Sequence, residues 1–189
     1  RYEIGGAGEP TQGAGAVALL VTPQPSLLTF DLPTGTSSGN ENTFYRPLGS
    51  EHAIVDGKES VKHYLAGLVR CYDDFLKNDG NPEHDLFVSH LPYTAIAKKA
   101  FAVFTLVQKI REASPDATED GFAELVERIF AGELKEIIEE AKATPDFEDR
   151  FQTQTAPSLP FSRRVGNIYT GSMYLGLSSV LTELGEQAN

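Results

Sequence analysis

Two long stretches of the chain place their apolar residues at helical spacing, and short apolar runs lie before the first stretch and between the two. Side chains three or four positions apart lie on the same side of a helix, so each stretch predicts a helix that buries one face. The first helix opens at residues 56–60, and its apolar face consists of Val61, Tyr64, Leu65, Leu68, Val69, Tyr72, Phe75 and Leu76. The apolar face of the second consists of Ile96, Ala100, Val103, Phe104, Val107 and Ile110.

The short apolar runs predict strands. Residues 16–21 are apolar at every position and follow a glycine-dense segment, which is typical of a central strand buried on both faces. Residues 27–30 predict a second strand, paired with the first across the turn at residues 23–25, and residues 86–89 predict a short buried strand. Strands that alternate with amphipathic helices indicate the α/β fold class. The strand count is low for a complete sheet, which suggests that part of the fold is missing.

The second half of the chain continues the helical pattern. Two glutamate-rich helices are expected on the surface, at about residues 119–131 and 133–143. Residues 157–160 are expected to form a linker, and a last helix is expected to span residues 173–184. The glycines before residue 16 would serve either tight backbone packing or a ligand, and the sequence favours neither.

The composition limits the expected partners. A net charge of −11 argues against nucleic acid, whose phosphates need basic patches, and an anionic ligand would also need a local basic cluster. No apolar run approaches the roughly 20 residues of a membrane helix, and the first residues contain no signal-peptide core. The one cysteine, Cys71, excludes an internal disulfide and fits a reducing cytoplasm. We therefore expect a cytoplasmic protein without nucleic-acid or membrane partners, and no metal-ligand spacing is present.

Two polar residues are the strongest candidates for chemistry. His90 stands where the predicted strand at residues 86–89 gives way to a loop, and ligands in α/β folds gather at the C-terminal ends of strands. A packed or surface histidine is the alternative, but the strand-end position favours a functional role. Asn167 lies between Gly166 and a run of small or hydroxylated residues that opens a helix. It would either cap that helix or donate an amide N–H to a developing oxyanion, and the residues alone leave both roles open.

Other polar residues have plainer interpretations. Ser60 lies near a helix start and is expected to cap it. Lys98 and Lys99 follow His90 on a helix and are expected on a wet surface, although they are the nearest positive charges to the suspected site. Cys71 lies inside a helix, away from any glycine turn or helix N-terminus, so we interpret it as structural.

Four blocks of the sequence resemble 3-hydroxy-3-methylglutaryl-CoA synthases of the bacterial mevalonate-pathway type. They are GEPTQGAGAVALL at 8–20, FYRPLG at 44–49 with IVDG at 54–57, HLPYT at 90–94 with KKA at 98–100, and VGNIYTGSMYL at 165–175. Four ordered blocks are far more specific than one short motif. The resemblance implies the middle and C-terminal part of a thiolase-like, layered α/β/α/β/α fold. Residues 1–50 would end its N-terminal half, and residues 51–189 would form its C-terminal half, truncated before the final strands.

The resemblance also implies a reaction and a role for each candidate residue. In this family a cysteine takes an acetyl group from acetyl-CoA, a glutamate removes a methyl proton, and the carbanion adds to the ketone of acetoacetyl-CoA. His90 matches the family's catalytic histidine and Asn167 its substrate-site asparagine. Ser60 and Lys99, with the adjacent Lys98, fall where the family contacts the CoA thioester, and Tyr169 matches a substrate contact of the family less specifically. The family implies a homodimer and no cofactor beyond the CoA thioesters, which are substrates.

Some features depart from the family and keep two alternatives open. Ala95 stands where relatives often carry lysine, and His52 replaces a frequent tyrosine. The family's cysteine and glutamate belong to a preceding part that is absent here, so the chain alone is expected to be inactive, because nucleophilic catalysis requires the nucleophile. One alternative is the same addition to a β-ketoacyl group on a carrier protein in polyketide assembly. The other is a non-catalytic CoA-binding module.

Overall fold

The protein is represented by a computed structural model, which describes residues 2–6, 8–115 and 118–187. Helices make up most of these residues. They are α1 (Gly57–Lys77), α2 (Ile96–Ala113), α3 (Thr118–Ala131), α4 (Leu134–Lys142), α5 (Phe147–Gln154), α6 (Leu159–Val165) and α7 (Gly171–Gln187), with short 3-10 helices η1 (Glu9–Thr11) and η3 (Ala156–Ser158). Among the described residues, the one sheet is an antiparallel pair, β1 (Phe44–Tyr45) and β2 (Ile54–Val55), in which Phe44 faces Val55.

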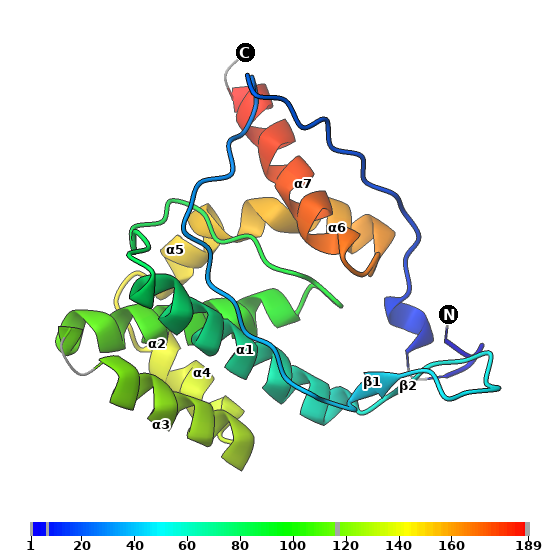
Figure 1. The fold of residues 1–189 in the computed structure, drawn as a ribbon, viewed down its shortest axis with the longest axis horizontal. Coiled ribbons are helices and arrows are strands. Elements are labelled where there is room, and N and C mark those ends of the chain that lie inside the picture. Colours follow the sequence, from blue (N-terminus) through cyan, green and yellow to red (C-terminus); the bar gives the residue numbers. More distant parts are fainter. Residues whose placement is uncertain (1, 7, 116–117, 188–189) are drawn as a thin grey trace.

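Helix α2 lies at the centre of the core. Every residue from 100 to 107 is buried, because α1, α3, α4 and α5 all pack against this helix. In Figure 1, α3 and α4 lie on one side of α1 and α2, and α6 and α7 lie on the other. The ring of Phe101 contacts those of Phe87, Phe104, Phe147 and Phe151, with ring centroids 5.4–6.5 Å apart. The sequence predicted a helix here with one buried face, and the helix is confirmed but is covered nearly all round.

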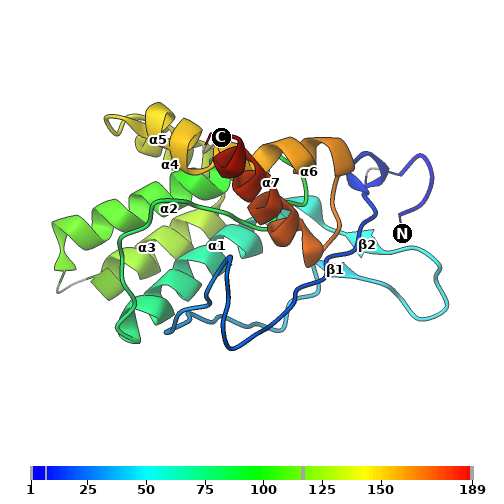
Figure 2. The same cartoon turned by 90° about the horizontal axis from the view of Figure 1, so that it is seen from above.

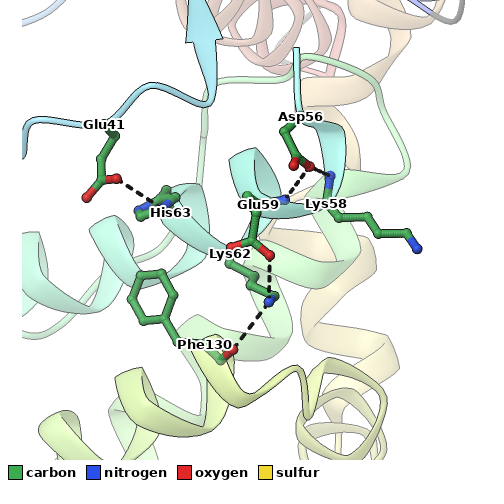
Figure 3. Close-up of polar contacts among 7 residues, drawn as sticks. All are labelled: Glu41, Asp56, Lys58, Glu59, Lys62, His63 and Phe130. Carbon is green, nitrogen blue, oxygen red and sulfur yellow. Dashed lines mark hydrogen bonds and ion pairs between the residues drawn. The ribbon is translucent and has the colours of Figure 1, made fainter.

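Helix α1 is fixed at its N-terminal half by a side-chain cap and by a polar contact to the end of α3 (Figure 3). The Asp56 side chain caps the helix by accepting hydrogen bonds from the backbone N–H groups of Lys58 and Glu59, both at 3.1 Å. One turn later, Lys62 Nζ donates to Glu59 at 2.8 Å and to the carbonyl of Phe130 at 3.2 Å, which ties α1 to the end of α3. Ser60 was expected to cap this helix, and that expectation is wrong because Asp56 supplies the capping oxygen.

The predicted strands at residues 16–21 and 27–30 are wrong for this structure. Both segments lack regular structure, and their apolar side chains are exposed, with Leu20 at 92% and Phe30 at 76%. A strand buried on both faces needs neighbours that take up its backbone hydrogen bonds, and no other strand lies beside these segments among the described residues. An apolar run in a sequence indicates that the segment tends to be buried, but it does not show which other segment would cover it. The α/β class is therefore not seen within the described part of the chain, which is mostly helical.

Two further predictions need correction. Residues 86–89 do not form a strand, and among the described residues the backbone N–H of Phe87 donates instead to the carbonyl of Gln154, at 2.8 Å. Residues 157–160 are not a linker, since η3 and α6 cover them, and α5 just before them was missed. The predicted glutamate-rich helices are confirmed as α3 and α4, and the predicted last helix is confirmed as α7. No helix in the described ranges is both long enough and apolar enough to cross a bilayer.

Helix α1 gives the first prediction. Replacing Asp56 with alanine removes the oxygen that pairs with two backbone N–H groups, and should lower the free energy of unfolding by about 1 kcal/mol in a urea titration. Asp56→Asn keeps a capping oxygen and should retain most of the stability. If Asp56→Ala leaves the unfolding curve unchanged, the cap does not stabilise α1.

Candidate active site

A cavity of about 380 Å³ lies where five separate segments of the chain meet. Figure 2 shows η1 and the β1–β2 hairpin together at one end of the molecule, next to the N-terminal end of α1, and these elements form part of the wall. The segment before α2 and the turn before α7 complete it. The lining residues are Tyr2, Gly8, Thr11, Phe44, Val55, Gly57, Ser60, Val61, Tyr64, His90, Pro92, Tyr93, Ile96, Asn167 and Tyr169.

His90 lines this cavity, where its backbone contacts Tyr64 and its ring lies near Tyr169. The Tyr64 hydroxyl, from α1, donates a hydrogen bond to the backbone carbonyl of His90 at 2.9 Å. Burial lowers the pKa of the His90 imidazole, and the nearby backbone of Tyr169 opposes this shift only in part. The imidazole is therefore mainly neutral at pH 7, so it adds no charge to the cavity.

Asn167 is 7% exposed, and its side chain makes a local turn. Its Oδ1 accepts hydrogen bonds from the backbone N–H of Tyr169, at 2.8 Å, and from the hydroxyl of Ser172, at 3.1 Å. The bond to the residue two positions on is an Asx turn, and α7 begins only at Gly171, so Asn167 is not that helix's N-cap. Both groups that contact this atom are hydrogen-bond donors, so the atom is the amide oxygen, and the remaining end of the amide is the Nδ2 group. No hydrogen bond from Nδ2 is present in the described part of the chain.

The backbone of Asn167 is joined to the segment after η1. Its N–H donates to the carbonyl of Thr11 at 2.8 Å, and its carbonyl accepts from the N–H of Gly13 at 2.9 Å. A methyl group on Gly13 would overlap the carbonyl of Val165, so glycine is required for this close approach. Of the two roles left open for the glycine-dense segment, tight backbone packing is the one that Gly13 has.

Three aromatic rings from distant parts of the sequence form one wall. The Phe44 ring lies 6.2 Å from that of Tyr2 and 6.1 Å from that of Tyr169, between ring centroids. Tyr169 has a positive φ of 55°, a backbone conformation that residues other than glycine and asparagine seldom adopt. The turn that holds Asn167 therefore also sets the position of the Tyr169 ring.

The structure brings together most of the residues that the sequence singled out, but not all of them. His90, Asn167, Ser60 and Tyr169 line one cavity, whereas Lys98 and Lys99 are not among its lining residues. Lys98 forms an ion pair with Glu148 at 2.7 Å, and its Nζ lies 5.3 Å from the ring centroid of Phe151.

Cys71 is half-buried on α1 and does not line the cavity. Burial raises the pKa of its thiol, which fits the structural interpretation.

Sequence reasoning missed several lining residues. Tyr64 was interpreted only as part of an apolar helix face, although it carries the hydroxyl that holds His90. Tyr2 and Phe44 lie in irregular or short segments, where no periodicity marks a side chain as inward-facing. The signal that was available for Tyr64 is chemical, since a buried tyrosine hydroxyl needs a hydrogen-bond partner.

Comparison with known proteins identifies the family of the chain. The family model described as Hydroxymethylglutaryl-coenzyme A synthase C terminal matches residues 33–188, which is most of the chain. The chain belongs to this family. The hydroxymethylglutaryl-CoA synthase of Enterococcus faecalis is 36% identical over 183 residues, which cover 96% of this chain and 39% of that protein. The synthase of Haloferax volcanii is 30% identical over 196 residues, which cover 98% of this chain and 44% of that protein. The chain thus spans about two fifths of the length of these curated hydroxymethylglutaryl-CoA synthases.

Solved structures of hydroxymethylglutaryl-CoA synthases share the fold. MvaS in complex with 3-hydroxy-3-methylglutaryl coenzyme A matches with a TM-score of 0.70 and 30% identity, over 95% of this chain and 42% of that chain. HMG-CoA synthase complexed with CoA matches with a TM-score of 0.68 and 27% identity, over 96% of this chain and 38% of that chain. The chain therefore has the fold of part of a hydroxymethylglutaryl-CoA synthase, a thiolase-like protein, although little of the sheet lies within the described residues.

The site gives a second prediction. Because burial disfavours the charged imidazole, an NMR titration of the histidine ring signals should place the pKa of His90 below the ordinary value of about 6.5. Replacing Tyr64 with phenylalanine leaves the ring burial in place and should not raise this pKa above the ordinary value. A pKa above that value in the ligand-free protein would contradict the view of a neutral imidazole.

Proposed function

We propose that the protein to which this chain belongs condenses acetyl-CoA with acetoacetyl-CoA to give 3-hydroxy-3-methylglutaryl-CoA, and that this chain supplies the site for the acetoacetyl group. The observation that carries the proposal is the meeting of His90 and Asn167 in one cavity, with the oxygen of the Asn167 amide already occupied. Membership of the hydroxymethylglutaryl-CoA synthase family supports the reaction class.

The chemistry needs hydrogen-bond donors at the acceptor ketone. When a carbanion adds to that ketone, its oxygen gains negative charge, and donors placed at that oxygen lower the barrier. A ring nitrogen of His90 and the Nδ2 of Asn167 are the groups we assign to this role. Both are uncharged, so they add no further negative charge to a chain with a net charge of −11, and the positive charge that an anionic thioester needs would have to come from lysines outside the cavity.

The remaining candidate residues have supporting roles in this proposal. Ser60, on the first turns of α1, and Tyr169 would contact the acyl end of the thioester, because both line the cavity. Lys99 would meet the CoA part outside the cavity. Lys98 is a weaker candidate, because its ammonium group is already paired with Glu148.

The nucleophile and the base are expected to come from outside this chain. Cys71 is the one cysteine of the sequence, and it is half-buried on α1 rather than in the cavity wall. The family resemblance assigns acetyl transfer to another cysteine and proton removal to a glutamate, in a part of the relatives that this chain does not cover. We also propose a homodimer in the cytoplasm, on the resemblance alone.

Replacing His90 or Asn167 with alanine should separate the two half-reactions of the full-length enzyme. Each variant should lose condensation on the order of 10²-fold, because a donor to the developing oxyanion is removed, while acetyl transfer to the enzyme's cysteine stays near normal. Condensation is measured as product formation, and acetyl transfer is measured as incorporation of radiolabelled acetyl groups into the protein. Equal loss of both half-reactions would contradict the assigned roles.

The same assay separates the proposed substrate from the alternatives. Acetoacetyl-CoA and a carrier-bound acetoacetyl group are compared as acceptors for the full-length protein. The proposal expects turnover with the CoA thioester. Turnover with the carrier-bound group alone would favour the polyketide reaction, and binding of CoA thioesters without any turnover would favour a non-catalytic module.

A further inference from the structure

Ser172 is a fully buried serine at the second position of α7, with a relative exposure of 0%. Its hydroxyl both accepts and donates a hydrogen bond. It accepts a hydrogen bond from the backbone N–H of Ile168 at 2.9 Å, and it lies 3.1 Å from Oδ1 of Asn167. Since Oδ1 cannot donate, the hydroxyl hydrogen points to Asn167, and the direction of this bond is fixed.

We propose that Ser172 is a positioning residue that holds the Asn167 carboxamide in one orientation, with its oxygen in the turn and its NH₂ group left for the ligand. The catalytic importance of that orientation rests on the proposed function. The orientation itself rests on the hydrogen bonds of the turn.

The orientation of the Asn167 amide depends on which of its two ends receives the hydrogen bonds of the turn. The backbone N–H of Tyr169 and the hydroxyl of Ser172 are both donors, and both meet the same atom. A flipped amide would place NH₂ against these two donors and lose both bonds, so the flipped orientation is disfavoured. Without the Ser172 hydroxyl, one of the two restraints disappears, and the two orientations come closer in energy.

The same turn also reaches His90. The backbone N–H of Ser172 donates to the carbonyl of Tyr169 at 2.9 Å, and the backbone of Tyr169 lies close enough to the His90 imidazole to affect its pKa. Ser172 thus contacts Asn167 through its hydroxyl and Tyr169 through its backbone N–H. Its hydroxyl acts on Asn167, and its N–H acts on the carbonyl next to His90, but only the hydroxyl is removed by substitution with alanine.

A double-mutant cycle in the full-length enzyme tests whether Ser172 acts through Asn167. We expect Ser172→Ala to lower kcat for condensation by about tenfold, the equivalent of one hydrogen bond of ordinary strength, in the protein that keeps Asn167. In the Asn167→Ala background the same change should have no further effect on kcat, because no amide remains to be oriented. A merely structural role would give the same loss in both backgrounds and would overturn the proposal.

Ser178 provides a matched control on the same helix. Its hydroxyl donates to the carbonyl of Tyr174 at 2.9 Å, and the residue is exposed and far along α7 from Asn167. Ser178→Ala should leave kcat within twofold of the wild type, since one exposed helix serine contributes little. A loss equal to that of Ser172→Ala would show that any change in the helix lowers the rate.

A spectroscopic measurement tests the orientation without turnover. In the full-length protein labelled with ¹⁵N-asparagine, the side-chain amide of Asn167 is assigned by its loss in Asn167→Ala. Ser172→Ala should shift or broaden this signal pair as the amide samples two orientations, and Ser178→Ala should leave it unchanged. An Asn167 pair that is identical in Ser172→Ala and the wild type would overturn the proposal. If the wild type makes no product, the proposed function fails, and this measurement still decides the role of Ser172.

Discussion

The candidate site depends on the backbone pairing between Asn167 and the segment that follows η1. Hydrogen bonds of 2.8 and 2.9 Å join Asn167 to Thr11 and Gly13, and they connect two parts of the chain that lie more than 150 positions apart. This pairing places the aromatic residues near the N-terminus beside the turn before α7. Helix α1, capped by Asp56 and tied to α3 by Lys62, supplies the opposite wall and the hydroxyl that holds His90.

The polar groups of the cavity work by orientation rather than by charge. Burial keeps the His90 imidazole mainly neutral, and the Asn167 amide is uncharged, so neither group pays the large cost of an isolated buried charge. Hydrogen bonds from Tyr169 and Ser172 hold the Asn167 amide, and the Tyr64 hydroxyl holds the backbone carbonyl of His90. Donors that are fixed before the substrate arrives need no reorganisation during the reaction, which is the basis of the proposed condensation.

The long helices could be predicted from sequence, because their periodicity is local, whereas the short helices α5 and α6 were missed. The patterns at residues 61–76 and 96–110 correspond to α1 and α2, whose buried faces include Leu65 and Val103. The strands could not be predicted in the same way, because the run at residues 16–21 specifies burial without specifying a neighbour. For the site, His90 and Asn167 were found from their places at the ends of elements. Tyr64 and Ser172 were missed because their roles depend on contacts that only the folded chain brings together.

The central claim is that His90 and Asn167 meet on one oxygen atom of the substrate. The most direct test is a crystal structure of the full-length protein with acetoacetyl-CoA bound. The account predicts that the ketone oxygen lies within hydrogen-bonding distance, about 2.7–3.2 Å, of both a ring nitrogen of His90 and the Nδ2 of Asn167. A thioester bound with its acyl group outside this cavity, or an Asn167 amide that presents its oxygen to the ligand, would contradict it.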